Sequence, residues 1–123
     1  MTILVVDDNP TNLKLVSDVL EFEGYQILQA ADAEQAQAVL KDSIPDLILM
    51  DIALPGMDGL TLTRLLKADA RTRHIRIVAL TAFAMKGDDQ KALDAGCDGY
   101  ITKPIDTRRL GGQVLEVLER RKG

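Results

Sequence analysis

Short apolar runs alternate with longer amphipathic stretches along the whole chain, and this alternation restricts the fold more than any other feature. The runs at 3–6, 47–50 and 75–80 are apolar enough to form strands buried on both faces. The segments at 26–29 and 99–102 are shorter and typical of edge strands. A chain that alternates strands with helices in this way builds a parallel sheet with helices on both faces.

The stretches between the strands carry helix-end signals. Asn9 can cap the first helix, Pro10 is suited to its first position, and Gly24 ends it. The other helices are predicted at 32–42, 58–69, 85–95 and from about 106 onward, with Asp32 as a second cap. The residues expected to face the core are Leu13, Val16 and Leu20, then Leu62, Leu65 and Leu66, and finally Leu110, Val114, Val117 and Leu118.

Gly111 and Gly112 lie inside the last predicted helix. Each glycine there costs about 1 kcal/mol relative to alanine. Two interpretations stay open: the start of the helix is frayed or kinked, or the glycines allow close packing against a neighbour.

Five strand–helix units with right-handed crossovers favour the strand order 2-1-3-4-5, which is the doubly wound, flavodoxin-like α/β fold. Ligands of such folds bind outside the carboxyl ends of the strands, where the strand order reverses. In this chain that point lies between the first and third strands.

The length and the net charge of the chain limit the classes of function that it can have. The 123 residues are expected to form a single domain, residues 1–123, with no output domain. The net charge of −4 disfavours direct binding to nucleic acid or to an anionic membrane. Cys97 is the only cysteine, which excludes an internal disulfide. With neither a signal peptide nor a long apolar span in the sequence, we expect a cytoplasmic protein.

Polar residues follow four of the predicted strands. Asp7 and Asp8 follow the first, Asp51 the third, Thr81 the fourth, and Lys103 the fifth. In a parallel sheet these residues gather at one edge. Crowded carboxylates repel one another unless a cation joins them, and aspartate oxygens suit Mg²⁺. The sequence therefore predicts a magnesium site.

A carboxylate beside Mg²⁺ can attack phosphorus and form an aspartyl phosphate. Asp51, after the central strand, is the natural nucleophile. Lys103 would offer an ammonium to one phosphoryl oxygen, and Thr81 would donate its hydroxyl to another.

The motifs ILVVDDN (3–9) and LILMDIALPGMDG (47–59), with Thr81-Ala82 and Lys103-Pro104, resemble the receiver domain of bacterial two-component response regulators. The resemblance covers the whole chain. The stretch TAFAMKGD (81–88) is similar to stand-alone regulators of the DivK type, which are CheY-like, and to receivers attached to hybrid histidine kinases.

The resemblance implies a role for each residue. Asp51 would accept phosphate from a histidine of a sensor kinase or phosphotransfer protein. Mg²⁺, for which Mn²⁺ is expected to substitute, would bind Asp8, Asp51 and the backbone carbonyl of Ala53, and would reach Asp7 through a water. The peptide bond before Pro104 is usually cis in this family.

The resemblance also implies a switch. Thr81 would move to meet the phosphoryl group, and Tyr100 would rotate into the vacated space. This would reshape the surface of the fourth helix, fifth strand and fifth helix, where a downstream protein binds. Ala53 and Phe83 flank the route of water to the acyl phosphate, and neither can position a water by hydrogen bonding. We therefore expect slow hydrolysis.

Three alternatives remain open. A Mg²⁺-dependent aspartyl-phosphate phosphatase would need a second acid where the chain has Ala53. A flavin-binding module would need a phosphate loop rich in glycine and hydroxyl groups, whereas this chain has Asp7, Asp8 and Asn9. The chain can also be a receiver fragment of a larger hybrid kinase or relay protein.

Overall fold

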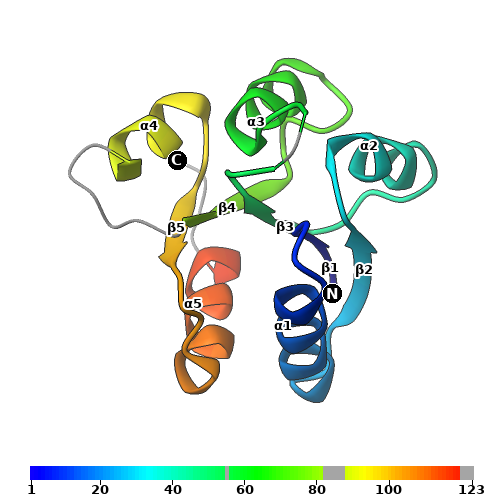
Figure 1. The fold of residues 1–123 in the computed structure, drawn as a ribbon. Coiled ribbons are helices and arrows are strands. Elements are labelled where there is room, and N and C mark those ends of the chain that lie inside the picture. The colour runs from blue at the N-terminus through cyan, green and yellow to red at the C-terminus, as the bar shows by residue number, and fades with distance from the viewer. Residues whose placement is uncertain (55, 82–87, 120–123) are drawn as a thin grey trace.

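The computed structural model describes residues 1–54, 56–81 and 88–119. Within this part of the chain, strands and helices alternate (Figure 1). The strands are β1 (Thr2–Val6), β2 (Gln26–Ala30), β3 (Leu47–Asp51), β4 (Arg76–Thr81) and β5 (Gly99–Thr102). The helices are α1 (Pro10–Phe22), α2 (Ala33–Asp42), α3 (Gly59–Ala68), α4 (Asp88–Ala95) and α5 (Thr107–Glu119).

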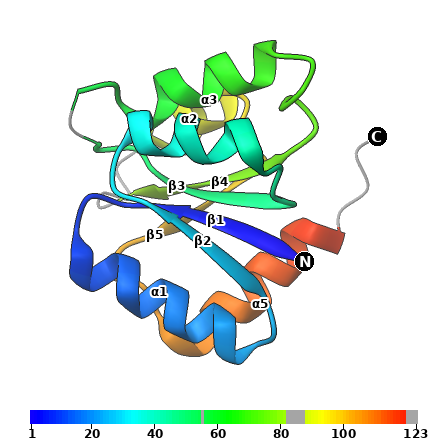
Figure 2. The same cartoon turned by 90° about the vertical axis from the view of Figure 1, so that its right-hand side faces the viewer.

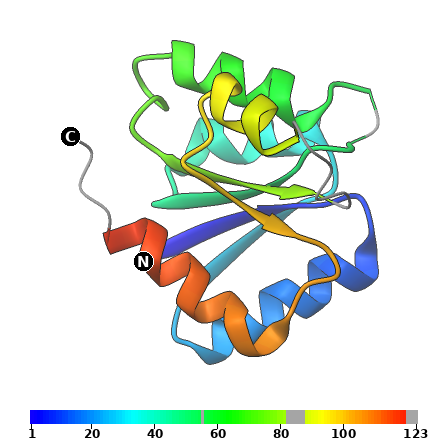
Figure 3. The ribbon, with the colours of Figure 1, turned by 90° about the vertical axis from the view of Figure 1, so that its left-hand side faces the viewer.

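The strands form one parallel sheet in the order β2-β1-β3-β4-β5, which confirms the predicted doubly wound fold. The chain starts in the middle of the sheet, extends to one edge at β2 and returns across β1 to β3. The carboxyl ends of β1 and β3 are therefore neighbours, with Val6 paired to Met50. Figures 2 and 3 show the sheet from its β2 side and its β5 side.

Helices cover both faces of the sheet. α1 and α5 lie on one face, while α2, α3 and α4 lie on the other (Figure 1). Side chains of β1 alternate between the two cores: Ile3 and Val5 pack toward α1 and α5, and Leu4 and Val6 pack toward the opposite face. None of the helices in the described ranges is long and apolar enough to cross a membrane.

The helix ends follow the predicted signals. The Asn9 side chain accepts hydrogen bonds from the backbone N–H groups of Thr11 and Asn12, and Pro10 begins α1. Asp32 caps α2 through Gln35 N. Gly24, with φ of +99°, follows α1 in a conformation that glycine adopts readily. The predicted beginning of the fourth helix at 85 lies outside the described residues, and the described helix runs from Asp88 to Ala95.

The prediction that Leu65 faces the core is wrong. Leu62 and Leu66 are buried, whereas Leu65 is 47% exposed. The buried stripe of α3 instead contains Thr63, whose hydroxyl donates to the carbonyl of Gly59 at 2.8 Å. That bond satisfies the hydroxyl inside the helix, so Thr63 can be buried while Leu65 lies on the outer face.

The two glycines of α5 differ in their surroundings. α5 is one helix from Thr107 to Glu119. A Cβ on Gly111 would lie 3.0 Å from a carboxylate oxygen of Glu23. Close packing against the end of α1 therefore accounts for Gly111. A Cβ on Gly112 would have no heavy atom within 4 Å.

We expect Gly112→Ala to raise the free energy of unfolding by about 0.5–1 kcal/mol, because alanine restricts the unfolded chain and meets no obstacle in the helix. Gly59→Ala is the matched comparison, since its Cβ would lie 2.9 Å from Ile52 Cα and closer still to the Asp51 carbonyl oxygen. We expect this variant to lose on the order of 1–3 kcal/mol. Urea unfolding measures both. A destabilised Gly112→Ala protein would contradict the assignment of open space around Gly112.

Candidate functional site

The predicted site residues gather at the carboxyl edge of the sheet. Asp7 directly follows β1, and Lys103 directly follows β5. Asp51 and Thr81 are the last residues of β3 and β4, rather than the first residues beyond them as predicted. The parallel arrangement alone brings together groups that are far apart in the sequence.

The turn between β1 and α1 fixes the first carboxylate. Asp7 N donates to the carbonyl of Ala30 at 3.1 Å, which continues the β1–β2 pairing by one residue. Asp7 Oδ1 accepts from Asn9 N at 2.9 Å. Asn9 in turn caps α1. The helix cap and the site carboxylate therefore form one hydrogen-bonded unit, in which Asp8 is left exposed.

Asp51 is held at both carboxylate oxygens. Oδ1 accepts from Ala53 N at 2.9 Å, and Oδ2 accepts from Lys103 Nζ at 2.9 Å. Its backbone is confined from the other side, because Gly59 packs directly on the Asp51 carbonyl. The sequence analysis missed the role of Gly59, because the Asp58-Gly59 pair at the start of α3 indicates a helix cap and not the close approach of the Asp51 backbone.

Lys103 bridges two carboxylates. Its Nζ lies 2.9 Å from Asp51 Oδ2 and 3.2 Å from Asp7 Oδ2. Lys103 N donates to the carbonyl of Thr81 at 2.7 Å, and the Lys103–Pro104 peptide bond is cis. Burial alone would lower the pKa of the ammonium, but the hydrogen bond that it donates to Asp51 and the charges of Asp51 and Asp7 outweigh this effect and raise the pKa. Lys103 is therefore a permanent cation in the site.

Asp7 is the site residue in unfavourable electrostatic surroundings. Its side chain is buried, and burial raises the pKa of the carboxyl despite the opposing effects of the Asn9 hydrogen bond and the Lys103 charge. The charge of Asp51 adds to the rise. Oδ2 accepts no hydrogen bond from the described residues, although Lys103 lies at ion-pair distance. A buried carboxylate oxygen that accepts no hydrogen bond is stabilised when a further cation binds to it.

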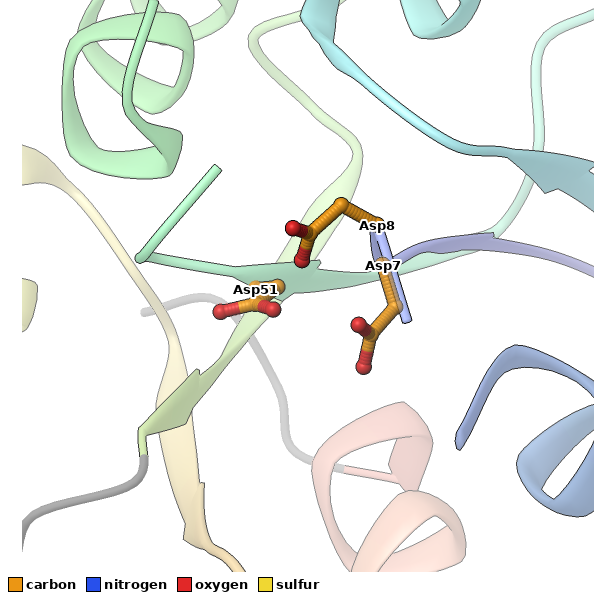
Figure 4. A group of neighbouring side chains, drawn as sticks. All are labelled: Asp7, Asp8 and Asp51. Atoms are coloured by element: carbon orange, nitrogen blue, oxygen red, sulfur yellow. The ribbon is translucent and has the colours of Figure 1, made fainter. Parts of the chain in front are cut away.

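The three aspartates suit such a cation. Asp7, Asp8 and Asp51 each offer an oxygen, and these oxygens lie within 4.8 Å of one another. Figure 4 shows the side chains coming from the β1–α1 turn and the end of β3. One lysine cannot neutralise three carboxylates. Mg²⁺ binds hard oxygen ligands and usually keeps some of its waters, so a group of carboxylates with one exposed member suits it. The residues present therefore fit this metal.

The remaining predicted residues surround the cluster. Thr81 is buried at the end of β4, and Ala53 is exposed beside Asp51. Tyr100 lies on β5 with 46% of its surface exposed, so its ring is at the surface in this structure. Phe83 falls outside the described residues.

Comparison with known proteins identifies the family. The pattern of the response regulator receiver domain matches residues 3–115. The chain belongs to the receiver domains of response regulators. The polar-differentiation response regulator DivK of Brucella ovis is 44% identical to this receiver over 108 residues, which cover 88% of each chain.

Solved structures agree with this assignment. A two-component response regulator from Clostridium difficile has a TM-score of 0.90 and 28% identity, covering 100% of this receiver and 99% of that chain. The receiver domain of the sensor histidine kinase PA1611 from Pseudomonas aeruginosa PAO1 has a TM-score of 0.87 and 35% identity, covering 97% and 98%. That structure has a magnesium ion coordinated in its active site cleft. Receiver domains are signalling proteins that work with histidine kinases or phosphotransfer proteins.

The charge imbalance of this receiver's site predicts an unusual stability change. We expect Asp7→Asn to raise the free energy of unfolding at pH 7 without divalent cations by on the order of 1 kcal/mol, because it removes a buried charge whose ionisation burial opposes. Mg²⁺ should stabilise the wild type by binding the folded state, and should stabilise the variant less. Urea unfolding with EDTA or with MgCl₂ measures both effects.

Asp98→Asn is the matched control for this experiment. The Asp98 carboxylate accepts from Lys67 Nζ at 3.1 Å and from Ile77 N at 2.9 Å, so its charge is locally balanced. Its neutralisation should destabilise the protein with and without Mg²⁺. If Asp7→Asn and Asp98→Asn lowered the free energy of unfolding equally, the charge imbalance around Asp7 would be contradicted.

Proposed function

We propose that this receiver accepts a phosphoryl group on Asp51 and passes the signal through its α4-β5-α5 surface. The observation that carries the proposal is the juxtaposition of three aspartate oxygens within 4.8 Å with a lysine ammonium 2.9 Å from Asp51. Among the three, Asp51 is best suited as acceptor, because Lys103 and the Ala53 N–H already hold its two oxygens in fixed directions. The donor is a phosphohistidine of a sensor kinase or phosphotransfer protein.

The transfer needs little bond chemistry from the protein. A carboxylate oxygen of Asp51 attacks the phosphorus, the P–N bond to the donor imidazole breaks, and the leaving imidazole nitrogen takes up a proton. When bound, Mg²⁺ supplies neutralisation of the phosphoryl charge. Asp8, Asp51 and the Ala53 carbonyl would hold the metal, with Asp7 acting through a water, and Mn²⁺ would substitute.

Lys103 is the residue whose partner changes during the reaction. Before transfer its ammonium neutralises Asp51. An acyl phosphate removes the negative charge of the carboxylate and places negative charge on the phosphoryl oxygens. The ammonium then follows the charge and binds one of those oxygens, and the Thr81 hydroxyl donates to another.

The switch begins at Thr81 and ends at Tyr100. Lys103 N bonds to Thr81 O, so the end of β4 is tied to the end of β5, which carries Tyr100. A groove of about 230 Å³ adjoins Tyr100 between α4, β5 and α5, with Leu93 and Gln113 among its lining residues. A movement of Thr81 toward the phosphoryl group makes room for the exposed ring to turn inward. This rotation changes the shape of the groove, and a downstream protein binds to the changed surface.

The competing functions are less well supported. A phosphatase would need an acid near Asp51 to protonate a leaving group, and Ala53 offers none. The acidic surroundings of Asp7, Asp8 and Asp51 suit neither nucleic acid nor an anionic membrane. We propose one receiver domain over residues 1–123 that assists its own phosphorylation in the cytoplasm. Attachment to a larger hybrid kinase or relay protein would leave the Asp51 chemistry the same.

Acetyl phosphate with Mg²⁺ tests the acceptor. We expect the wild type to gain 80 Da, the mass of one phosphoryl group, and Asp51→Asn to gain none, because the amide is not a nucleophile. Thr81→Ala should still accept the group, because its carboxylates are intact. Intact-protein mass spectrometry measures the product. Incorporation that survives in Asp51→Asn would mean that another residue is the acceptor.

The phosphoryl group should be long-lived. Ala53 has no polar side chain to orient an attacking water, so we expect Ala53→Asn to shorten the half-life of the phosphorylated protein by about tenfold, which is less than a true general base supplies because the amide only positions the water. Phe83→Glu, at the second flanking position, should act in the same direction. Decay of the phosphorylated mass after removal of acetyl phosphate gives the rates. Unchanged rates in both variants would refute slow hydrolysis by water exclusion.

A further inference from the structure

A groove of about 570 Å³ lies at the opposite end of the sheet from the aspartate cluster. The residues that line it are Thr2, Glu21, Gly24, Tyr25, Gln26, Ile27 and Leu28. They come from the start of β1, the end of α1, the following turn and the first half of β2. Figure 2 looks toward this side of the molecule, with β2 in front of the sheet.

One wall of the groove is the unpaired edge of the sheet. β2 pairs only with β1 among the described strands. Gln26 N donates to Met1 O, and Ala30 O accepts from Asp7 N, so the even-numbered residues of β2 direct their backbone groups toward β1. The N–H and C=O groups of Ile27 and Gln29 therefore point outward. Such an edge is a template for another extended segment.

Two aromatic residues precede this edge in the sequence. Phe22, the last residue of α1, is 92% exposed, and Tyr25 lines the groove itself. The chain has only two tyrosines and two phenylalanines. An almost fully exposed phenylalanine next to a groove gains nothing from folding, whereas aromatic side chains are typical anchors of protein interfaces.

The charge around the edge is negative at both ends of β2. Glu21 lines the groove beside its amino end, and Glu34 is exposed just beyond its carboxyl end, whereas the Glu23 side chain lies against Gly111 of α5. Burial raises the pKa of Tyr25, and the charges of Glu23 and Glu119 raise it further. Lys14, a cation on α1, is already paired with Asp18 at 2.8 Å.

We propose that the outer edge of β2, with the adjoining groove and Phe22, binds a basic extended segment of a partner protein as an additional strand. The backbone groups of Ile27 and Gln29 supply the pairing, Phe22 supplies an apolar anchor, and the glutamates select positive charge. This surface lies outside the phosphorylation chemistry and does not depend on the proposed function.

A second copy of the chain fits this edge poorly. Antiparallel pairing of two β2 strands would bring Glu21, before the strand of one copy, near Asp32 and Glu34, which follow the strand of the other. Like charges that are brought close together repel one another. The charge pattern therefore favours a basic partner over self-association.

A labelled peptide of ten residues that alternates lysine with valine is the probe, used in MgCl₂ so that the aspartate cluster is not the preferred cation site. We expect amide shifts in ¹⁵N spectra to centre on residues 22–29. A peptide that alternates glutamate with valine should not bind. A lysine–valine peptide with proline at alternate positions should bind at least about fivefold more weakly, because proline lacks the N–H that strand pairing needs.

Variants of the receiver complete the test. Glu21→Gln with Glu34→Gln should weaken peptide binding by about tenfold, and Phe22→Ser by several-fold. Asp94→Asn on α4 and Leu65→Ser on α3 remove an exposed acid and an exposed leucine elsewhere and should change the affinity less than twofold. Asp51→Asn should leave peptide binding intact even if it abolishes phosphorylation. The proposal would be overturned if the amide shifts centred on residues 7, 8 and 51. It would also be overturned if the control variants lost as much affinity for the peptide as the edge variants.

Discussion

The ammonium of Lys103 holds the functional edge of this protein together. It lies 2.9 Å from Asp51 and 3.2 Å from Asp7, two carboxylates that the ends of β3 and β1 bring into a largely buried space. Without it, the folded chain would place two buried anions side by side with no compensating cation, which costs several kcal/mol. A lysine ammonium is carried on a flexible stem of four carbons. The ion pairs of Lys103 therefore stabilise the site as it stands, and under the proposed function the same ammonium would turn to a phosphoryl oxygen.

The topology explains why the charges meet where they do. In the order β2-β1-β3-β4-β5, the loops after β1 and β3 leave the sheet toward opposite faces, so their first residues border an open space. Asp7 is anchored there through Asn9 and the α1 cap, and Asp51 through Gly59 at the start of α3. Each carboxylate thus depends on a helix terminus on a different face. A change of charge between them acts on both layers of the fold.

Much of this arrangement could be predicted from the sequence, because buried parallel strands are continuous apolar runs and their polar successors must share an edge. The bounds of β5 and the caps at Asn9 and Asp32 follow from local chemistry. Leu65 was assigned to the core wrongly, since spacing alone does not reveal that a satisfied Thr63 hydroxyl can occupy the buried stripe. The contact of Gly59 with the Asp51 carbonyl and the double ion pair of Lys103 are tertiary facts, for which the sequence gives only residue types.

The two ends of the sheet contrast in their charge balance. At the amino end, Lys67 donates to the carbonyl of Ile75 at 2.7 Å and to Asp98 at 3.1 Å, and Asp98 also accepts from Ile77 N. In this cluster one cation is paired with one anion, and the hydrogen bonds of the pair link α3, β4 and β5. At the carboxyl end, one cation meets three carboxylates. A deficit of positive charge in a partly buried carboxylate cluster is one that a bound cation can offset. The location of the imbalance, more than any single residue, therefore supports the proposal that a metal ion and a phosphoryl group bind at the carboxyl edge.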